Sequence, residues 1–192
     1  MNLKKEKYII KIPNNTSVVY CEKKNILTIK GPLLQKSINL KLKIFVNKYK
    51  KLIKISQIHI AKISNKERKK IKSLRGTTKA LIKHKLIEAS IVIHKKLKLH
   101  GVGYRTLLND VYSKDKLLTF KLGYSHLIYF KIPLKLNIFC FNKTKICIFG
   151  NSYQDVNQIS AKIKSKKPPE PYKGKGILYE NEIIILKEGK KI

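Results

Sequence analysis

The sequence predicts an α+β fold of two tandem related domains, each a mainly antiparallel sheet packed with one helix. Short runs of β-branched and aromatic residues alternate with turn residues along most of the chain, which is typical of hairpins. Two further stretches show the apolar spacing of amphipathic helices. An internal repeat suggests that the two halves are related. We place the domains at residues 1–93 and 94–192.

The repeat joins two stretches of about twenty residues. In the first, Ile12-Pro13 precedes the runs SVVYC and LTIKG. In the second, Ile132-Pro133 precedes NIFCF and ICIFG. A Lys- and Asn-rich turn separates the two runs in each copy, as expected for a hairpin. We therefore infer an internal duplication.

The first predicted helix lies in SLRGTTKALIKHKLIEASIVIH and closes the first domain. We expect Thr77 or Thr78 to be its N-cap, because a hydroxyl can accept a hydrogen bond from the free N–H groups of a first turn. Leu81, Ile82, Leu86 and the alanines Ala80 and Ala89 are predicted to form its buried stripe.

The second predicted helix follows Gly150. Ser152 is placed to cap it, and Asp155 suits the positive end of the helix dipole. A buried face is predicted from the i, i+3, i+7 spacing of Val156, Ile159 and Ile163. Lysines crowd its C-terminal end, and Pro168 stops it.

The charge of the chain predicts a polyanionic partner. Lys and Arg number 44 against 11 Asp and Glu, a formal net charge of +33, while the hydrophobic fraction of 43% argues against disorder. No apolar run approaches the ~20 residues of a membrane helix, and no secretory signal is recognisable. We expect no membrane partner and no small-molecule substrate.

Neither an enzyme nor a cofactor is predicted. GVGYR lacks the third glycine of a dinucleotide-binding loop, GKGIL lacks the spacing of a P-loop, and no HExxH motif occurs. Cys21, Cys140 and Cys147 form no CxxC pair, so we expect reduced core thiols and no metal site. Glu180 and Glu182 are expected at a solvated strand edge.

The segment KKPPEPYKGKGI, residues 166–177, is the strongest candidate for binding. Three prolines predict an extended arm, in which Lys173 and Lys175 would point the same way. Tyr172 offers a flat face to a ribose or base and a hydroxyl to a phosphate. Glu170 is expected to form a salt bridge with a neighbouring lysine. The alternative is a Pro/Gly surface loop with solvated lysines and a packed tyrosine.

Three blocks carry a resemblance to a known family. PPEPYKGKGI resembles the signature of the universal large-subunit ribosomal protein six ("L-six") family. GTTKALIKHKLIEASIVIHKKLKLHGVGYR and LTFKLGYSH are similar to two further family blocks. The resemblance implies two tandem α+β domains and a structural role in the large ribosomal subunit. It further implies binding to large-subunit rRNA near the sarcin-ricin loop and stalk base, beside other ribosomal proteins and the site where translational GTPases dock.

The resemblance also implies which positions face RNA. In the arm these are Lys166, Lys167, Pro169, Glu170, Pro171, Tyr172, Lys173, Gly174, Lys175 and Gly176. In the other two blocks they are Gly101, Gly103, Tyr104, Arg105, Gly123, Tyr124, Ser125 and His126. Turn glycines and packed tyrosines are the alternative for these last two blocks. Leu178 departs from the family, which commonly has a cation there.

The amino-acid usage bears on the compartment. Arginine occurs only at positions 68, 75 and 105, although its guanidinium group binds phosphate better than an ammonium group does. Abundant Lys, Ile and Asn with scarce Arg indicates AT-rich codons. We therefore predict an organelle-encoded protein of a mitochondrial ribosome, with a plastid-type organelle or a bacterial cytoplasm as the alternative.

The alternative to a ribosomal function is that of a free-standing basic RNA-binding protein outside the ribosome.

Overall fold

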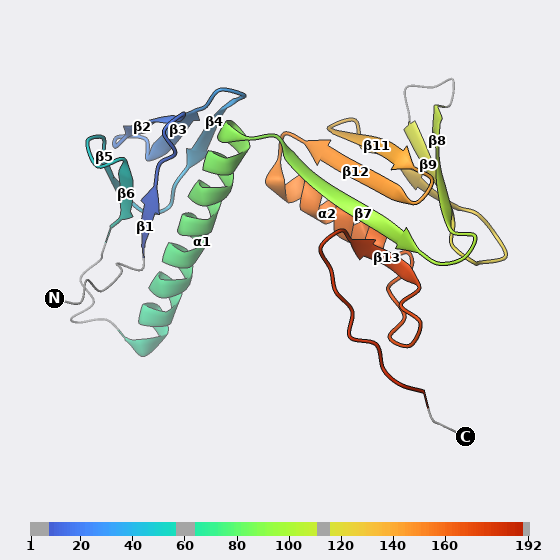
Figure 1. Cartoon of the computed structure of the whole chain (residues 1–192). Coiled ribbons are helices and arrows are strands. Elements are labelled where there is room, and N and C mark those ends of the chain that lie inside the picture. Colours follow the sequence, from blue (N-terminus) through green and yellow to red (C-terminus); the bar gives the residue numbers. More distant parts are fainter. Residues whose placement is uncertain (1–7, 57–63, 111–115, 190–192) are drawn as a thin grey trace. The chain divides into compact units, whose positions relative to one another are not determined.

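The computed structural model describes residues 8–56, 64–110 and 116–189 (Figure 1). The chain divides into two compact units, residues 1–91 and 92–192. Each unit contains two antiparallel sheets and one helix, so the predicted α+β class is confirmed.

The first unit has six strands followed by a long helix. The strands are β1 (Ile9–Lys11), β2 (Ser17–Cys21), β3 (Ile26–Lys30), β4 (Gln35–Asn39), β5 (Ile44–Asn47) and β6 (Leu52–Ile55), and the helix is α1 (Asn65–Ser90). They form two sheets with the orders β1-β6-β5 and β2-β3-β4. α1 packs on strands of both sheets and covers their buried aliphatic residues.

The second unit repeats this plan and adds one strand. Its elements are β7 (Ile93–His100), β8 (Arg105–Asp110), β9 (Lys116–Lys121), β10 (Ile128–Lys131), β11 (Leu136–Asn142), β12 (Lys145–Gly150), α2 (Tyr153–Lys164) and β13 (Gly176–Tyr179). The sheet orders are β10-β9-β8 and β11-β12-β7-β13. α2 packs against β7, β12 and β13 (Figure 1).

The sheet orders show how the units correspond. Replacing β1–β6 by β7–β12 converts β1-β6-β5 into β7-β12-β11 and β2-β3-β4 into β8-β9-β10, which are the pairings observed. The duplicated plan is therefore six strands followed by a helix. In both copies the first strand pairs with the last, which brings the two ends of the six-strand segment together.

The Ile-Pro repeat seen in the sequence is real, but it is offset from this duplication. The Pro13 carbonyl accepts a hydrogen bond from Thr16 N–H at 3.1 Å, and the Pro133 carbonyl accepts one from Leu136 N–H at 3.0 Å. The same turn thus precedes both hairpins. It matches β1–β3 with β10–β12 instead of β7–β9.

α1 begins earlier than the sequence predicted. It starts at Asn65, and the Thr77 and Thr78 hydroxyls donate to the Leu74 carbonyl at 2.9 Å each, within the helix. Side-chain bonds to the preceding turn replace the predicted cap. The residues from Asn65 to Ser73 are mainly Lys, Arg and Glu, which favour helix without an apolar stripe, so periodicity did not reveal them.

The buried stripe of α1 was predicted in part. Ile82, Leu86 and Ala89 are buried as expected, but Leu81 is 46% exposed and Ala80 is also exposed. Ile82, Leu86 and Ala89 follow the i, i+4, i+7 spacing of one helix face. Leu81 lies one residue, or roughly 100°, away from that face.

α2 agrees with its prediction. The Ser152 hydroxyl accepts a hydrogen bond from Asp155 N–H at 3.4 Å, and Val156, Ile159 and Ile163 are buried. Lys162 and Lys164 lie in its last turn.

The prediction that the cysteines are core thiols holds for one of the three. Cys147 is buried, and burial raises its pKa above the ordinary value; Cys140 is half-buried, and its pKa is raised for the same reason. Cys21 is exposed, so its assignment to the core was wrong. Val18 marks the inward face of β2, and Cys21 lies on the opposite face because side chains alternate along a strand.

The first prediction concerns the contact between Gly31 and α1. A Cβ at Gly31 would lie 2.1 Å from the Ala89 carbonyl oxygen and 2.8 Å from Ala89 Cβ. Gly31→Ala should therefore lower the free energy of unfolding by about 1–3 kcal/mol, measured by urea titration, because α1 must move away from the strands. Gly76→Ala is the control. It lies in α1 with nothing near its added Cβ, and it should stabilise the protein by about 0.5–1 kcal/mol. Equal stability of the two variants would contradict this packing.

Candidate nucleic-acid interface

The predicted arm is a closed loop and is not extended. Glu170 N–H donates to the Lys175 carbonyl and Gly174 N–H donates to the Glu170 carbonyl, both at 2.9 Å. Gly174 has a φ of +65°, a backbone conformation that glycine adopts without strain. The prolines restrict their own φ angles but do not prevent the chain from reversing after Tyr172. The expectation that Lys173 and Lys175 point the same way, which required an extended chain, therefore loses its basis.

The two ends of the loop are held close together. Ile177 N–H donates to the Lys167 carbonyl at 2.9 Å, just where β13 begins to pair with β7. A Cβ at Gly176 would lie 2.6 Å from Pro169 Cα and 2.8 Å from the Pro168 carbonyl oxygen. Gly176 is therefore required for the close approach of the two backbone segments.

The C-terminal segment supports the other side of the loop. Lys187 N–H donates to the Pro171 carbonyl at 2.9 Å, and Leu186 lies next to Gly174. Glu170 stabilises the loop through its backbone N–H and carbonyl groups. Among the described residues it forms no salt bridge, so that expectation was wrong. The loop is thus fixed by backbone contacts from both directions.

Glu182 holds the start of this segment to α2. Its carboxylate accepts hydrogen bonds from Lys164 Nζ, at 2.7 Å to Oε2, and from Tyr179 N–H at 3.1 Å. The bond from Lys164 lowers the pKa of Glu182 below its ordinary value. Glu180 lies 3.4 Å from Lys96 Nζ. Both carboxylates are therefore paired, where the sequence predicted only a solvated edge.

The block from Gly123 to His126 lies against the start of the loop. The Tyr124 hydroxyl donates to the Lys166 carbonyl at 3.2 Å, and Lys167 Nζ lies 4.2 Å from the centre of the Tyr124 ring. The His126 ring stacks on Tyr124 with centroids 5.9 Å apart. Tyr124 remains 39% exposed and Ser125 is exposed, so this block presents an aromatic and polar surface beside the lysines.

The block from Gly101 to Arg105 completes the site. Nδ1 of His100 lies 3.1 Å from the Gly174 carbonyl oxygen, at hydrogen-bond distance. The Tyr104 ring packs between Gly101 and Gly123, where an added Cβ would approach it to 2.8 and 3.1 Å respectively. Tyr104 therefore fits the alternative of a packed tyrosine. Gly103 and Arg105 are exposed.

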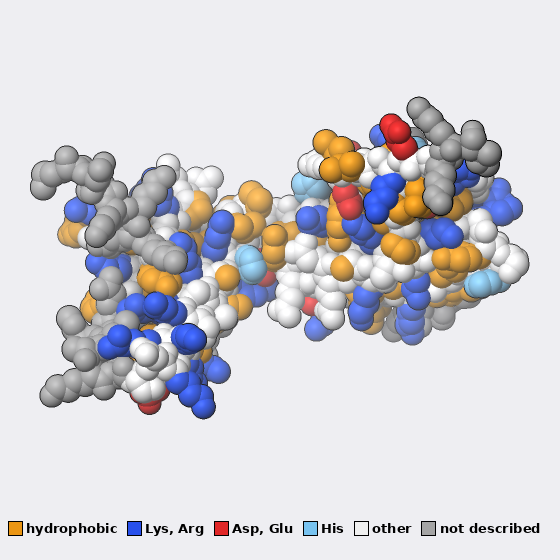
Figure 2. All heavy atoms as spheres, turned by 90° about the horizontal axis from the view of Figure 1, so that it is seen from below, with side chains coloured by type: hydrophobic (Ala, Val, Ile, Leu, Met, Phe, Trp, Pro, Cys, Tyr) orange, Lys and Arg blue, Asp and Glu red, His pale blue; other side chains and the backbone are white. Residues whose placement is uncertain are grey.

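The structure thus brings the predicted RNA-facing positions of all three blocks together at one end of the second unit, and we call this the three-block surface. Its exposed or half-buried cations are Arg105, Lys166, Lys167, Lys173 and Lys175. Tyr172, at the loop tip, is 52% exposed. Figure 2 shows how strongly Lys and Arg side chains prevail over Asp and Glu on the face in view. A dense set of fixed cations beside aromatic rings can neutralise phosphates and stack on bases.

Sequence reasoning missed the residues that support this surface. His100 and Lys187 contact the loop directly, and the Lys164–Glu182 pair holds the C-terminal segment that supports it. No motif marks these contacts, because they join positions that are distant in the sequence. Leu178, at the position of the missing cation, is half-buried in β13. Within residues 8–56, 64–110 and 116–189, no cluster of His, Cys, Asp or Glu could hold a metal, and no helix is long and apolar enough to cross a membrane.

Fold and site together define a basic α+β protein of two duplicated units with a cationic, aromatic loop surface on the second. Residues 100–180, which include the loop and the stretches Gly101–Arg105 and Gly123–His126, match the family model described as Ribosomal protein L6. Large ribosomal subunit protein uL6 of Mycoplasmoides gallisepticum is 41% identical over 184 residues, covering 95% of this chain and 93% of the relative. The protein of the same name from Malacoplasma penetrans is 40% identical and covers 95% and 92%.

The chain belongs to the ribosomal protein L6 family. Members of this family are structural ribosomal proteins, so the prediction that the chain is not an enzyme is confirmed. The relatives named here are bacterial, and the predicted mitochondrial origin finds no support in them.

The second prediction concerns the pH dependence of the Glu182–Lys164 contact. A carboxylate whose pKa is lowered by folding stabilises the protein above its ordinary pKa, and this contribution is lost as the pH falls through the lowered value. Glu182→Gln should therefore reduce the free energy of unfolding at pH 7, with the difference from the unaltered protein shrinking as the pH falls below the ordinary value of 4.5. Chemical denaturation at several pH values measures it.

The control for this prediction is Glu188→Gln. Glu188 is an exposed carboxylate of the same segment, and it forms no ion pair within the described part of the chain. We expect this variant to match the unaltered protein at every pH. A pH-independent effect of Glu182→Gln would show that its carboxylate charge is not what matters.

Proposed function

We propose that this chain is a structural constituent of the large ribosomal subunit and binds large-subunit rRNA through the three-block surface. The convergence of the three blocks carries the proposal, because residues from distant parts of the chain form one cationic surface. The relatives are named as large ribosomal subunit proteins, which supports the proposed role in the large subunit. In this proposal residues 94–192 form the rRNA-binding domain, and residues 1–93 form the N-terminal domain.

The geometry of the loop explains how it would bind RNA tightly. Backbone hydrogen bonds from Glu170, Gly174, Ile177 and Lys187 already fix the loop, so binding need not order it. Lys173 and Lys175 would neutralise phosphates, and the exposed ring of Tyr172 would stack on a base or ribose. Lysine binds as a point charge, without the bidentate geometry of arginine, so the binding should be strongly salt dependent.

The location on the rRNA is a finer part of the proposal. The resemblance of the three blocks to their family implies a site near the sarcin-ricin loop and stalk base, next to other ribosomal proteins and the docking site of translational GTPases. Directed hydroxyl-radical cleavage from a probe attached at position 172 would test it. Cleavage around the sarcin-ricin loop is the expected result, and cleavage confined to other rRNA regions would refute the location.

The compartment is also part of the proposal. The scarcity of arginine led to the prediction of a mitochondrial ribosome, whereas the bacterial relatives favour the alternative of a bacterial cytoplasm. We propose a bacterial-type large subunit in either case. Mass spectrometry of salt-washed large subunits purified from each compartment would locate the chain at stoichiometric abundance. Its absence from every ribosome would leave the free-standing RNA-binding protein as the better function.

The third prediction tests the lysines of the loop. If the loop region makes ~5 phosphate contacts, the log-log salt slope of rRNA binding should be near −4. Lys173→Ala with Lys175→Ala should then reduce the magnitude of the slope by about 1.5 and weaken binding at low salt. Filter binding to a large-subunit rRNA fragment over a salt series measures both.

The control removes the same charge elsewhere. Lys23 and Lys24 are exposed in the turn between β2 and β3, and Lys23→Ala with Lys24→Ala should leave the slope unchanged. Unfolding curves of both double variants should match that of the unaltered protein. A similar loss of slope in both would mean that net charge, and not the loop, binds the RNA.

A further inference from the structure

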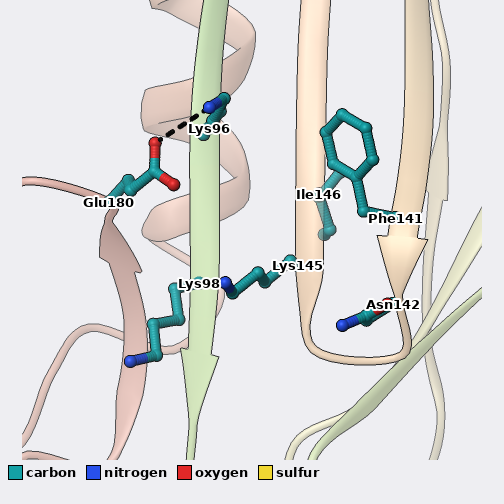
Figure 3. Close-up of a pocket in the computed structure, with 7 residues that line it drawn as sticks. All are labelled: Lys96, Lys98, Phe141, Asn142, Lys145, Ile146 and Glu180. Atoms are coloured by element: carbon teal, nitrogen blue, oxygen red, sulfur yellow. Dashed lines mark ion pairs between the residues drawn. The ribbon is translucent and has the colours of Figure 1, made fainter.

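The sheet face of the second unit that is turned away from α2 carries residues that the three-block surface does not use. β12 pairs with β7 so that Lys145 lies opposite Lys98 and Cys147 opposite Lys96, and β11 places Phe139 opposite Cys147. Directly paired residues of an antiparallel sheet share a face. Phe139 and the three lysines therefore lie on one side, and Figure 3 shows α2 on the other side of the strands.

Two aromatic rings are open to solvent on this face and at its edge. Phe139 and Phe141 are 60% and 59% exposed, and their ring centroids lie 5.9 Å apart with an interplanar angle of 58°. Cys147, between Phe139 and Lys96, is buried, so the rings lie on a closed surface and not over a gap in the core. A single exposed apolar residue is ordinary, but an exposed pair beside cations is the arrangement on which bases stack.

One of the three lysines on this face is paired, and the other two are not. Glu180 pairs with Lys96 at 3.4 Å, whereas Lys98 and Lys145 form no ion pair within the described part of the chain. They are also directly opposite each other, and like charges in that position destabilise a sheet. A bound anion would remove this repulsion.

Phe141 and the three lysines line a hollow large enough for a nucleotide. Its volume is about 410 Å³, and Lys96, Lys98, Lys145, Phe141, Asn142 and Glu180 are among its lining residues. Figure 3 shows Phe141 and Asn142 on β11 at one side, and Lys98 and Lys145 on the neighbouring strands. Cations for phosphates, the Phe141 ring for a base and an amide for a base edge thus surround one space, and the Phe139 ring lies next to Phe141.

We propose that this face binds unpaired RNA nucleotides, with bases stacked on Phe139 and Phe141 and phosphates at Lys98 and Lys145. A double helix keeps its bases stacked inside and offers none to the two rings, which favours single-stranded RNA. An acidic protein segment would form ion pairs with the lysines, but its carboxylates would not stack on the two exposed rings. This site goes beyond the proposed function, because it uses none of the residues assigned to the three-block surface.

Binding of a fluorescein-labelled uridine decamer, followed by anisotropy at low salt, tests the proposal. Phe139→Leu with Phe141→Leu keeps an apolar surface but removes the rings, and it should weaken binding at least about tenfold. Phe45→Leu is the control, because Phe45 is 64% exposed on β5 of the first unit, and its affinity should be unchanged. A decamer with 5-iodouridine should cross-link to a peptide containing Phe139 or Phe141.

The results that would contradict this proposal can be distinguished from one another. Full affinity in the double phenylalanine variant, or cross-links only outside β11, would overturn the proposal. If the double variant Lys173→Ala with Lys175→Ala loses decamer binding and the double phenylalanine variant does not, the decamer binds at the three-block surface instead. If polyglutamate, but no oligonucleotide, binds in a manner that depends on Phe139 and Phe141, the face takes an acidic protein. The salt slope on the rRNA fragment reports separately on the proposed function.

Discussion

The pairing of β13 with β7 is the constraint on which the interface depends. It returns the chain after α2 to the edge of the four-stranded sheet, beside β7, and it aligns Gly176 with His100. The loop between Lys166 and Gly176 must then close within a short distance. That closure requires the close approach at Gly176 and the left-handed backbone at Gly174. The Gly-Lys-Gly pattern is thus explained by geometry before any ligand is considered.

The same pairing joins the loop to the two other blocks. β7 leads directly into the turn that holds Gly101 and Tyr104, and Tyr104 in turn packs against Gly123. Tyr124 then reaches the Lys166 carbonyl. Each contact is weak by itself, but together they fix the positions of lysines that repel one another. In a protein of formal charge +33, this bracing of the backbone holds the lysines in place against their mutual repulsion.

Elements marked by local sequence signals were predicted correctly, whereas features that depend on distant contacts were not. α2 was predicted with its cap and buried face because Ser152, Asp155 and the spacing of Val156, Ile159 and Ile163 are local signals. The first turns of α1 were missed because their lysines favour helix without a periodic apolar stripe. The loop was mistaken for an extended arm because proline restricts only its own φ, while Gly174 and contacts from distant segments decided the reversal.

The sequence by itself determined the α+β class, the duplicated character of the chain, its need for a polyanionic partner and the family to which it belongs. These follow from composition, periodicity and short motifs, which act within a few residues of one another. Only the tertiary structure decided that three separate blocks meet at one end, that Glu182 pairs with Lys164, and that Lys98 faces Lys145 beside two open rings. Such contacts depend on strand register and packing between distant segments, and local sequence carries no direct record of either.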